Sequence, residues 1–234
     1  MSAAGSEPSD RIRGLATYPV LFPFLLRQLP CGRHGLAREV VAASQRARLL
    51  EAALVLVGGE GYAAASAVRV SSAAGVSPTT FYQHFQTKED CVMAACDVVL
   101  GRLLKELCDA VLADADWARG VGHGLRCLLS RLAAEPHVAR VCFVELRAAD
   151  LAGPQRHVEA IESLAVALRP PRRNPKLPEV CEEVIAGGVW NTIHATIVKE
   201  SPAALPRLLP ALHHHVLVYH LGPVQADQIS RLSV

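Results

Sequence analysis

Apolar residues recur at positions i, i+3 and i+4 from about Ser44 to the end of the chain, while runs that alternate apolar with polar residues are missing. The first spacing places apolar side chains on one face of an α-helix, whereas a half-buried strand needs the alternation. The sequence therefore predicts an all-α protein. Its 234 residues are enough for one large domain or two modest ones.

The overall charge excludes two classes of protein. The chain has 24 Lys and Arg against 22 Asp and Glu, a formal net charge of +2, and 51% of its residues are hydrophobic. Such a chain can bury enough surface to fold, so it is neither a disordered tail nor a histone-like polycation. Residues 1–50 nevertheless carry seven arginines against three acidic residues. Any nucleic acid must therefore be bound by a local basic patch.

The seven cysteines are odd in number, scattered and without a C-x-x-C pair, which argues against a disulfide framework and against a zinc site. The longest apolar stretch near the start, residues 18–26, is interrupted by two prolines and is far shorter than the roughly 20 residues that span a bilayer. It also lacks the cleavage pattern of a signal peptide. We expect a cytoplasmic protein with no membrane partner.

Helix start and stop signals divide the chain. Residues 1–43 are punctuated by Gly, Pro, Ser and Arg, which is typical of an amino-terminal extension or arm. Beyond it, apolar spacing and flanking caps predict a helix from Ser44 to the glycines at 58 and 59, then helices over about 66–73, a short segment from 78, 88–107, 117–134, 137–150, 155–168, 178–199 and 202–220.

Residues 68–88, VRVSSAAGVSPTTFYQHFQTK, contain two short helices joined by a turn at Gly75. This pattern is typical of a helix-turn-helix, in which the second helix enters the major groove of DNA. Ser77 is suited to cap that helix, and Pro78 can occupy its first position without loss of an amide bond. The segment therefore predicts a DNA-binding element.

The second helix divides into two faces. Phe81 and Phe85 lie four residues apart and can pack inward, which leaves Thr79, Tyr82 and Gln83 on another face. The amino end of the helix, at Ser77, Pro78, Thr79 and Thr80, offers unbonded amides and a positive dipole end that favour a phosphate. Base-reading and phosphate-binding groups thus share one short element.

The stretch AAGVSPTTFYQHFQTKED resembles the Ala-Gly-Val-Ser, Thr-aromatic-Tyr-x-His-Phe and Lys-Glu pattern of TetR-type bacterial transcriptional regulators. The Gly-Arg-His-Gly arm at residues 32–35 is similar to that of a subset of this family. The resemblance implies a three-helix helix-turn-helix domain at 44–90 and an effector-binding and dimerisation domain at 91–234, with about nine helices in all. It also implies a homodimeric repressor that binds a palindromic double-stranded operator and is released by a small-molecule effector.

The resemblance further implies which residues contact DNA. Thr79 and Tyr82 would touch bases, with Pro78, Ser77 and Gln83 beside them on the recognition helix. The phosphate contacts would be Ser66, Thr80, His84 and Lys88, and Arg46 of the first helix is a further candidate. Taken alone, Tyr82 is more typical of a core aromatic, His84 of a surface histidine and Lys88 of a solvated charge. The motif is what favours DNA contact.

Arg33 and His34 on the arm could lie in the minor groove, whose negative potential attracts arginine. The alternative is a disordered amino-terminal segment whose charges have no role in binding.

In the family the last two helices form a dimeric four-helix bundle, and the apolar residues of 178–199 and 202–220 spread wider than one face, which favours an interface. Effector-pocket candidates are apolar or polar residues expected to face between helices, although each is also explained as plain core: Trp117, His123, Cys127, Phe143, Leu146, His157, Leu164 and Trp190. Few acidic residues interrupt these helices, so an apolar or neutral effector is favoured. We interpret the pair Glu182 and Glu183 as a solvated helix face.

Two other functions were weighed. A metal- or redox-responsive regulator would use histidines 213–215 and His220, or Cys91 and Cys96, but adjacent residues on a helix point about 100° apart, so the triplet cannot chelate from one face. An enzyme is disfavoured because the sequence has no nucleophile elbow, H-E-x-x-H motif, phosphate loop or convincing carboxylate pair. We expect no catalysis, no cofactor and no bound metal.

Overall fold

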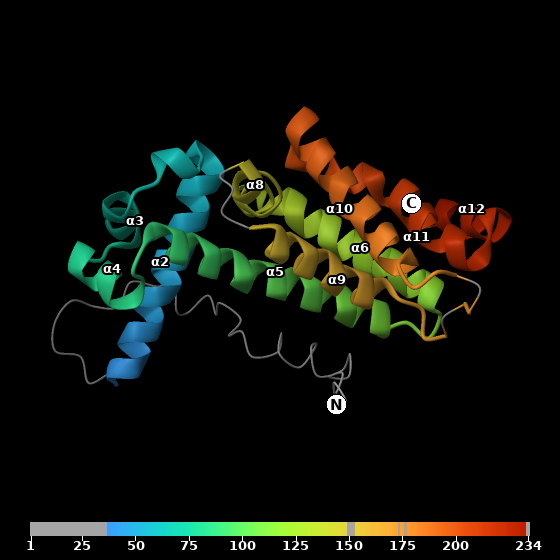
Figure 1. Cartoon of the computed structure of the whole chain (residues 1–234), viewed down its shortest axis with the longest axis horizontal. Coiled ribbons are helices and arrows are strands. Elements are labelled where there is room, and N and C mark those ends of the chain that lie inside the picture. The colour runs from blue at the N-terminus through green and yellow to red at the C-terminus, as the bar shows by residue number, and fades with distance from the viewer. Residues whose placement is uncertain (1–36, 149–152, 173, 176, 233–234) are drawn as a thin grey trace, which may run out of the picture. The chain divides into compact units, whose positions relative to one another are not determined.

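The computed structural model describes residues 37–148, 153–172, 174–175 and 177–232 (Figure 1). Every regular element within these ranges is helical, so the expected all-α class is confirmed. No helix in this part of the chain is long and apolar enough to cross a membrane. The Gly-Arg-His-Gly arm, with Arg33, lies outside the described residues.

The described residues form two compact units. The amino-terminal unit holds 37–99 and 137–148, and the carboxyl-terminal unit holds 100–136 and the residues from 153 onward. The long helix α5 (Lys88–Leu112) contributes to both. The unit that contains the helix-turn-helix therefore extends beyond residue 90 along α5 and takes in a second, distant segment of sequence.

Helix α2 is the centre of the amino-terminal unit, because α3, α4, η1 and the π turn η2 all pack against it (Figure 1). The helices in its first segment are α2 (Arg38–Glu60), the 3-10 turn η1 (Tyr62–Ala64), α3 (Ala67–Ala74) and α4 (Pro78–His84). Helix α2 begins six residues before Ser44, where the sequence predicted its start. Residues 38–43 contain no Gly or Pro, and Glu39 in the first turn suits the helix dipole, so the helix extends into the expected arm.

The segment expected to form one helix over 137–150 is interrupted. It consists of α7 (Pro136–Arg140), a π turn η2 (Val141–Glu145) and α8 (Leu146–Ala148). The amide of Leu146 bonds to the carbonyl of Val141, five residues back, which is the defining bond of a π turn. This π turn packs on α2.

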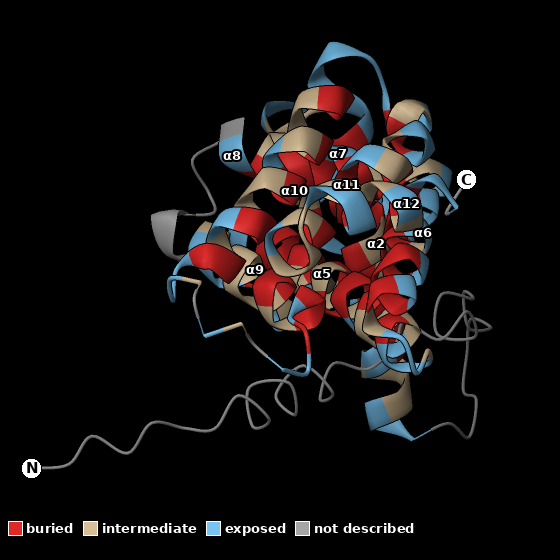
Figure 2. Cartoon of the chain, turned by 90° about the vertical axis from the view of Figure 1, so that its right-hand side faces the viewer, coloured by how far each residue is buried: buried red, intermediate tan, exposed pale blue. Residues whose placement is uncertain are grey.

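The carboxyl-terminal unit holds the second half of α5 together with α6 (Trp117–Ala134), α9 (Gly153–Leu168), α10 (Cys181–Lys199), η3 (Pro202–Leu208), α11 (Leu209–Leu221) and α12 (Pro223–Arg231). Figure 2 shows buried and exposed residues alternating along these helices. The single helix expected over 202–220 is divided into η3 and α11. Pro206 and Pro210 lack amide donors, so the regular α-helical bonds cannot form through this stretch.

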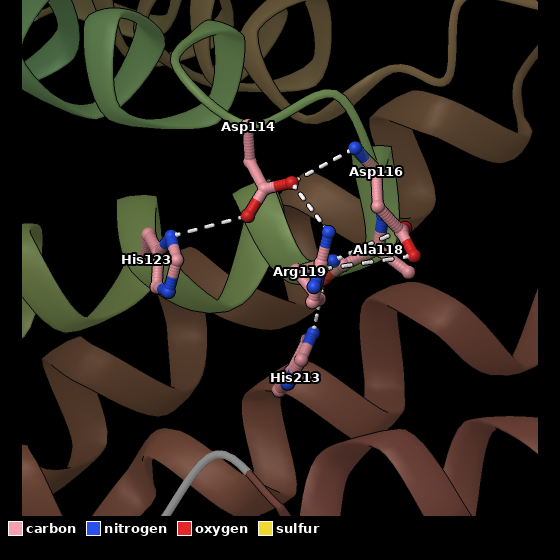
Figure 3. A network of polar contacts seen from close by, with 6 residues as sticks. All are labelled: Asp114, Asp116, Ala118, Arg119, His123 and His213. Carbon is pink, nitrogen blue, oxygen red and sulfur yellow. Dashed lines mark hydrogen bonds and ion pairs between the residues drawn. The ribbon is translucent and has the colours of Figure 1, made fainter.

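His213 of α11 is fully buried against α6. Its Nε2 lies 2.7 Å from the carbonyl oxygen of Ala118 (Figure 3), so the neutral ring donates that hydrogen bond. A Cβ added to Gly122 would lie 2.9 Å from the ring, which shows how closely α6 approaches it. Burial is the main cause that lowers the pKa of His213; the bond to Ala118 opposes this effect, and the nearby His123 adds to it.

A network of polar contacts fixes the turn between α5 and α6 (Figure 3). The Asp114 carboxylate accepts the backbone N–H of Asp116 at 2.9 Å and pairs with Arg119 and, at 3.7 Å, with His123. The hydrogen bond from the Asp116 amide is the main cause that lowers the pKa of Asp114. Asp116 in turn caps α6 through the amide of Ala118.

The burial of His213 makes stability depend on pH. The unfolded chain protonates this ring near its ordinary pKa of 6.5, whereas the folded protein resists protonation, so the free energy of unfolding falls as the pH drops below 6.5. Between about pH 7.5 and pH 5.5 this group costs at most about 1.4 kcal/mol. Urea unfolding at about pH 7.5 and pH 5.5 measures this effect. The free energy of unfolding should fall less between these pH values in H213Q than in the wild type, because the glutamine amide carries no titrating proton and can still donate a hydrogen bond near the position of Nε2.

The half-exposed neighbour His214 provides the matched control, because H214Q should retain the pH dependence of the wild type. An equal pH dependence in H213Q and the wild type would contradict the assignment.

Candidate nucleic-acid interface

The turn between α3 and α4 is built on Gly75. Its φ of 64° and ψ of 39° lie in the left-handed region, which glycine adopts without strain. The amides of Gly75 and Val76 bond back to the carbonyls of Ser72 and Ser71 at 3.1 and 3.0 Å, which closes the end of α3. The expected turn at Gly75 is confirmed.

Arg48 of α2 holds this turn in place. Its guanidinium donates to the carbonyl oxygens of Ala74 at 2.8 Å and Gly75 at 3.4 Å, at the negative end of the α3 dipole. The helix-turn-helix pattern did not predict this role of Arg48. The one available signal was an arginine between buried leucines and alanines of α2, at a position too close to the core to be a solvated charge.

The start of α4 is capped as expected. Ser77 Oγ accepts the amide of Thr80 at 3.0 Å and lies 2.9 Å from the Thr80 hydroxyl, and Pro78 occupies the first turn. Ser66 likewise caps α3 by accepting the amide of Arg69 at 3.2 Å. Both serines are exposed, so the hydroxyls proposed for phosphate contact also complete the helix ends.

The two faces of α4 separate as the spacing predicted. Phe81 is fully buried and Phe85 is 6% exposed, whereas Tyr82 is 60% exposed. Thr79 and Gln83 are also exposed. Phe81 meets the ring of Tyr82 edge-on at 5.3 Å, which steadies Tyr82 without burying it. A helix of seven residues thus presents three polar side chains to the outside.

Arg46 and His84 lie together beside this face. The Arg46 guanidinium sits 4.7 Å from the centre of the Phe85 ring, while His84 Nε2 lies 3.4 Å from Gln45 Oε1. Partial burial and, second, the charge of Arg46 lower the pKa of His84. At neutral pH the imidazole is therefore an uncharged hydrogen-bonding group, and Arg46 supplies the positive charge.

Lys88 has a second role that the motif did not reveal. Its ammonium donates to the carbonyls of Tyr62 at 3.0 Å and Ala65 at 2.8 Å and lies 3.9 Å from the centre of the Tyr62 ring. Two of its three N–H donors are therefore used inside the domain. One donor remains for the phosphate contact that the resemblance implies.

The proposed effector residues are divided between the two units. His157 and Trp190 lie close, with ring centres 5.6 Å apart, and Leu164 is buried. Trp117 donates to the Leu168 carbonyl at 3.2 Å. Phe143 and Leu146 fall in the amino-terminal unit.

Two polar members of the pocket set differ in their exposure. Cys127 is half-buried, whereas the side chain of His123 is 59% exposed and faces Asp114. His123 therefore lies on the surface of α6.

Three residues of the metal and redox alternatives have structural roles. Cys91 is fully buried, its thiol donates to the Leu49 carbonyl at 3.8 Å, and burial raises its pKa to about 12, which suppresses the reactive thiolate. His213 and His215 bond to backbone carbonyls of α6 and α10. Within the described residues no three metal-binding side chains converge.

Glu182 was interpreted as part of a solvated helix face, but in the structure this residue is buried. Its residue surface is only 3% exposed, so that interpretation is wrong for Glu182. The first turn of α10 faces inward at this position, and an acidic side chain does enter the carboxyl-terminal unit.

Residues 49–95, from the middle of α2 into α5, match the family model described as bacterial regulatory proteins, tetR family. No curated protein matches the chain.

Several solved structures share the fold. The fatty acid degradation regulator FadR from Bacillus halodurans is 21% identical with a TM-score of 0.64, over 74% of this chain and 94% of that one. FadR from Bacillus subtilis, in complex with stearoyl-CoA, is 17% identical with a TM-score of 0.59, over 75% and 97%. A gamma-butyrolactone receptor, an ArpA-like protein, is 18% identical with a TM-score of 0.58, over 82% and 98%.

Proposed function

We propose, from the premise that this chain carries the DNA-binding domain of the tetR family of bacterial regulatory proteins, that it is a homodimeric, non-catalytic repressor. It would bind a palindromic operator in the cytoplasm and be released by a small apolar or neutral ligand. The observation that carries the proposal is α4, which buries Phe81 and leaves Tyr82 60% exposed. A helix that holds its aromatic anchor inward and its polar face outward is suited to the major groove.

The same element accounts for both kinds of DNA contact. Thr79, Tyr82 and Gln83 would meet base edges, while Ser77 and Thr80 at the capped start would meet a phosphate. Arg46 and His84 extend the phosphate-binding surface along α2 and the end of α4, and Ser66 and Lys88 add one hydrogen bond each. Helix α4 would recognise the base sequence of the DNA, and the remaining groups would fix the position of this helix along the DNA.

Tyr82→Ala tests the recognition helix. We expect wild-type protein to select a palindromic duplex from a randomised library, and Y82A to bind that duplex about tenfold to 100-fold more weakly, since a base contact contributes about 1–3 kcal/mol. Fluorescence anisotropy measures the affinity. Y82F should lose less, because it keeps the ring.

The melting temperature and oligomeric state should stay unchanged in both variants, because Tyr82 is mostly exposed. Equal affinity of Y82A and wild type would disprove the recognition-helix assignment. Failure of the wild type to select any duplex would remove the proposal itself.

The dimer proposal rests on an exposed apolar face of α10. Val184 and Val198 are 55% and 58% exposed and lie 14 residues apart, close to four helical turns. Gly187 lies between them with open space where a Cβ would stand. Tyr219 of α11 is 41% exposed. Solvent-exposed apolar side chains on one helix face favour a protein partner, and a second copy would place two recognition helices about 34 Å apart.

Val198→Glu should therefore convert the dimer to a monomer in sedimentation velocity and weaken binding to the palindromic duplex, because it places a charge in an apolar interface. Val55→Glu is the matched control. Val55 is 48% exposed on α2 of the amino-terminal unit and is not part of the proposed interface on α10 and α11, so V55E should remain dimeric. A dimeric V198E would place the interface elsewhere.

The ligand proposal rests on the apolar interior of the carboxyl-terminal unit, where the buried residues of α6 are mostly leucine, glycine and alanine. Of the structures that share the fold, Bacillus subtilis FadR is in complex with stearoyl-CoA, which has an apolar acyl tail on a charged head, and another is a gamma-butyrolactone receptor. We propose an uncharged ligand with an apolar tail for this chain. Differential affinity for the form that does not bind DNA would then lower operator affinity.

Alkyl γ-butyrolactones of increasing tail length provide the test. Each buried methylene contributes about 0.8 kcal/mol, so the concentration that releases the selected duplex should fall about fourfold for each methylene that becomes buried. Thermal stabilisation should follow the same order. Release by Zn²⁺ or by peroxide, with no response to any lactone, would instead support the metal or redox alternative.

A further inference from the structure

We infer that Arg140 and Glu145, at the two ends of the π turn η2, position the helix-turn-helix by clasping the junction between α2 and η1. They are positioning residues for DNA binding, more than 50 residues from α4 in sequence. The inference rests on the proposed DNA-binding function and adds the element that sets its geometry. All the contacts that carry it lie inside the amino-terminal unit.

Arg140 and Glu145 form hydrogen bonds on opposite sides of the junction between α2 and η1. Arg140 Nε donates to the Gly58 carbonyl at 3.0 Å, near the end of α2, and Glu145 Oε2 accepts the Tyr62 amide at 3.2 Å, at the start of η1. Arg140 also pairs with Glu145 at 3.4 Å. The cation therefore meets the carbonyl end of α2, which is favourable at the carboxyl end of a helix, and the carboxylate accepts the first amide of η1.

The π turn is what brings these two side chains together. In an α-helix, residues five apart point about 140° away from each other. A π turn has more residues per turn than an α-helix, as its i→i+5 bond requires, so residues five apart lie closer to one face, and η2 begins directly after Arg140 and ends at Glu145. A return of this turn to α-helical geometry would swing Glu145 away from Arg140 and from Tyr62. The contacts of Arg140 and Glu145 with the α2–η1 junction therefore depend on the π geometry of this one turn.

Tyr62 links the clasp to the DNA-binding helices. Its amide is held by Glu145, while its carbonyl and its ring are both held by Lys88. Lys88 also holds the carbonyl of Ala65, the residue before the cap of α3. Because Lys88 is the first residue of α5 and closely follows α4, displacement of Tyr62 would act on the start of α3 and on the end of the recognition helix together.

Helix α7, which leads into the π turn, packs closely against α2. A Cβ on Gly58 would lie 2.4 Å from the backbone oxygen of His137, so the backbones of α2 and α7 are in direct contact. His137 Nε2 also lies 3.9 Å from Glu51. The segment follows α6 directly in the chain, and α6 belongs to the carboxyl-terminal unit.

The test compares Glu145→Ala with Glu145→Gln. E145A removes the acceptor for the Tyr62 amide, so hydrogen exchange of that amide should accelerate about tenfold or more, and affinity for the duplex selected by wild type should fall several-fold. E145Q keeps an oxygen acceptor and loses the charge, so it should recover part of both. Circular dichroism and sedimentation of both variants should match the wild type. Loss of a purely stabilising residue would instead lower the melting temperature without changing the DNA affinity of the folded protein.

Gly58→Ala and Gly59→Ala form a second, matched pair. A Cβ on Gly58 must push α7 off α2, whereas Gly59 has open space, so G58A should reproduce the weaker DNA binding and G59A should not. This pair decides the question even if E145A fails to fold.

Wild-type DNA affinity in folded E145A and G58A would overturn the inference. If wild type selects no duplex, the proposed function fails separately. Exchange at Tyr62 then still tests the clasp, and an unchanged rate in E145A would overturn it.

Discussion

The burial of Phe81 is the interaction on which the proposed DNA-binding surface depends. A helix of seven residues is too short to be stable alone, so the position of α4 must come from its contacts. Phe81, fully enclosed, provides the apolar anchor, Ser77 caps the start, and Arg48 fixes the preceding turn. Since these contacts all lie on the inner side or at the amino end, the outer face of α4 is left open, and Tyr82 is exposed without cost to the core.

Local signals made much of this unit predictable from sequence. Serine at 66 and 77, proline at 78 and glycine at 75 each act within a few residues, and the structure has each in the expected role. The division of α4 into two faces follows from the four-residue spacing of Phe81 and Phe85. The family pattern then assigned roles to the outer face, which spacing alone could not do.

What the sequence did not reveal depends largely on contacts between distant residues. The phosphate contact implied for Lys88 stays a prediction, but nothing in the local sequence indicated its hydrogen bonds to the carbonyls of Tyr62 and Ala65, 26 and 23 residues earlier. Glu182 was expected on a solvated face, and it is buried because the first turn of α10 faces inward. The π turn at 141–145 has no periodicity of its own in sequence, so an uninterrupted helix was the natural expectation. The pocket residues could not be grouped, because their grouping depends on how helices pack.

The placement of Lys88 connects the electrostatics of the surface to its geometry. The chain has little net charge, so binding a phosphate backbone depends on where individual cations sit. Lys88 is held by carbonyls of the η1 region, and η1 is in turn held by Glu145 at Tyr62. Loss of the Glu145 contact would thus release both a structural restraint on α3 and the restraint on a positive charge next to α4. In the proposed function, the same few hydrogen bonds would control both shape and charge at the interface, so a carboxylate outside the helix-turn-helix would govern the affinity for DNA.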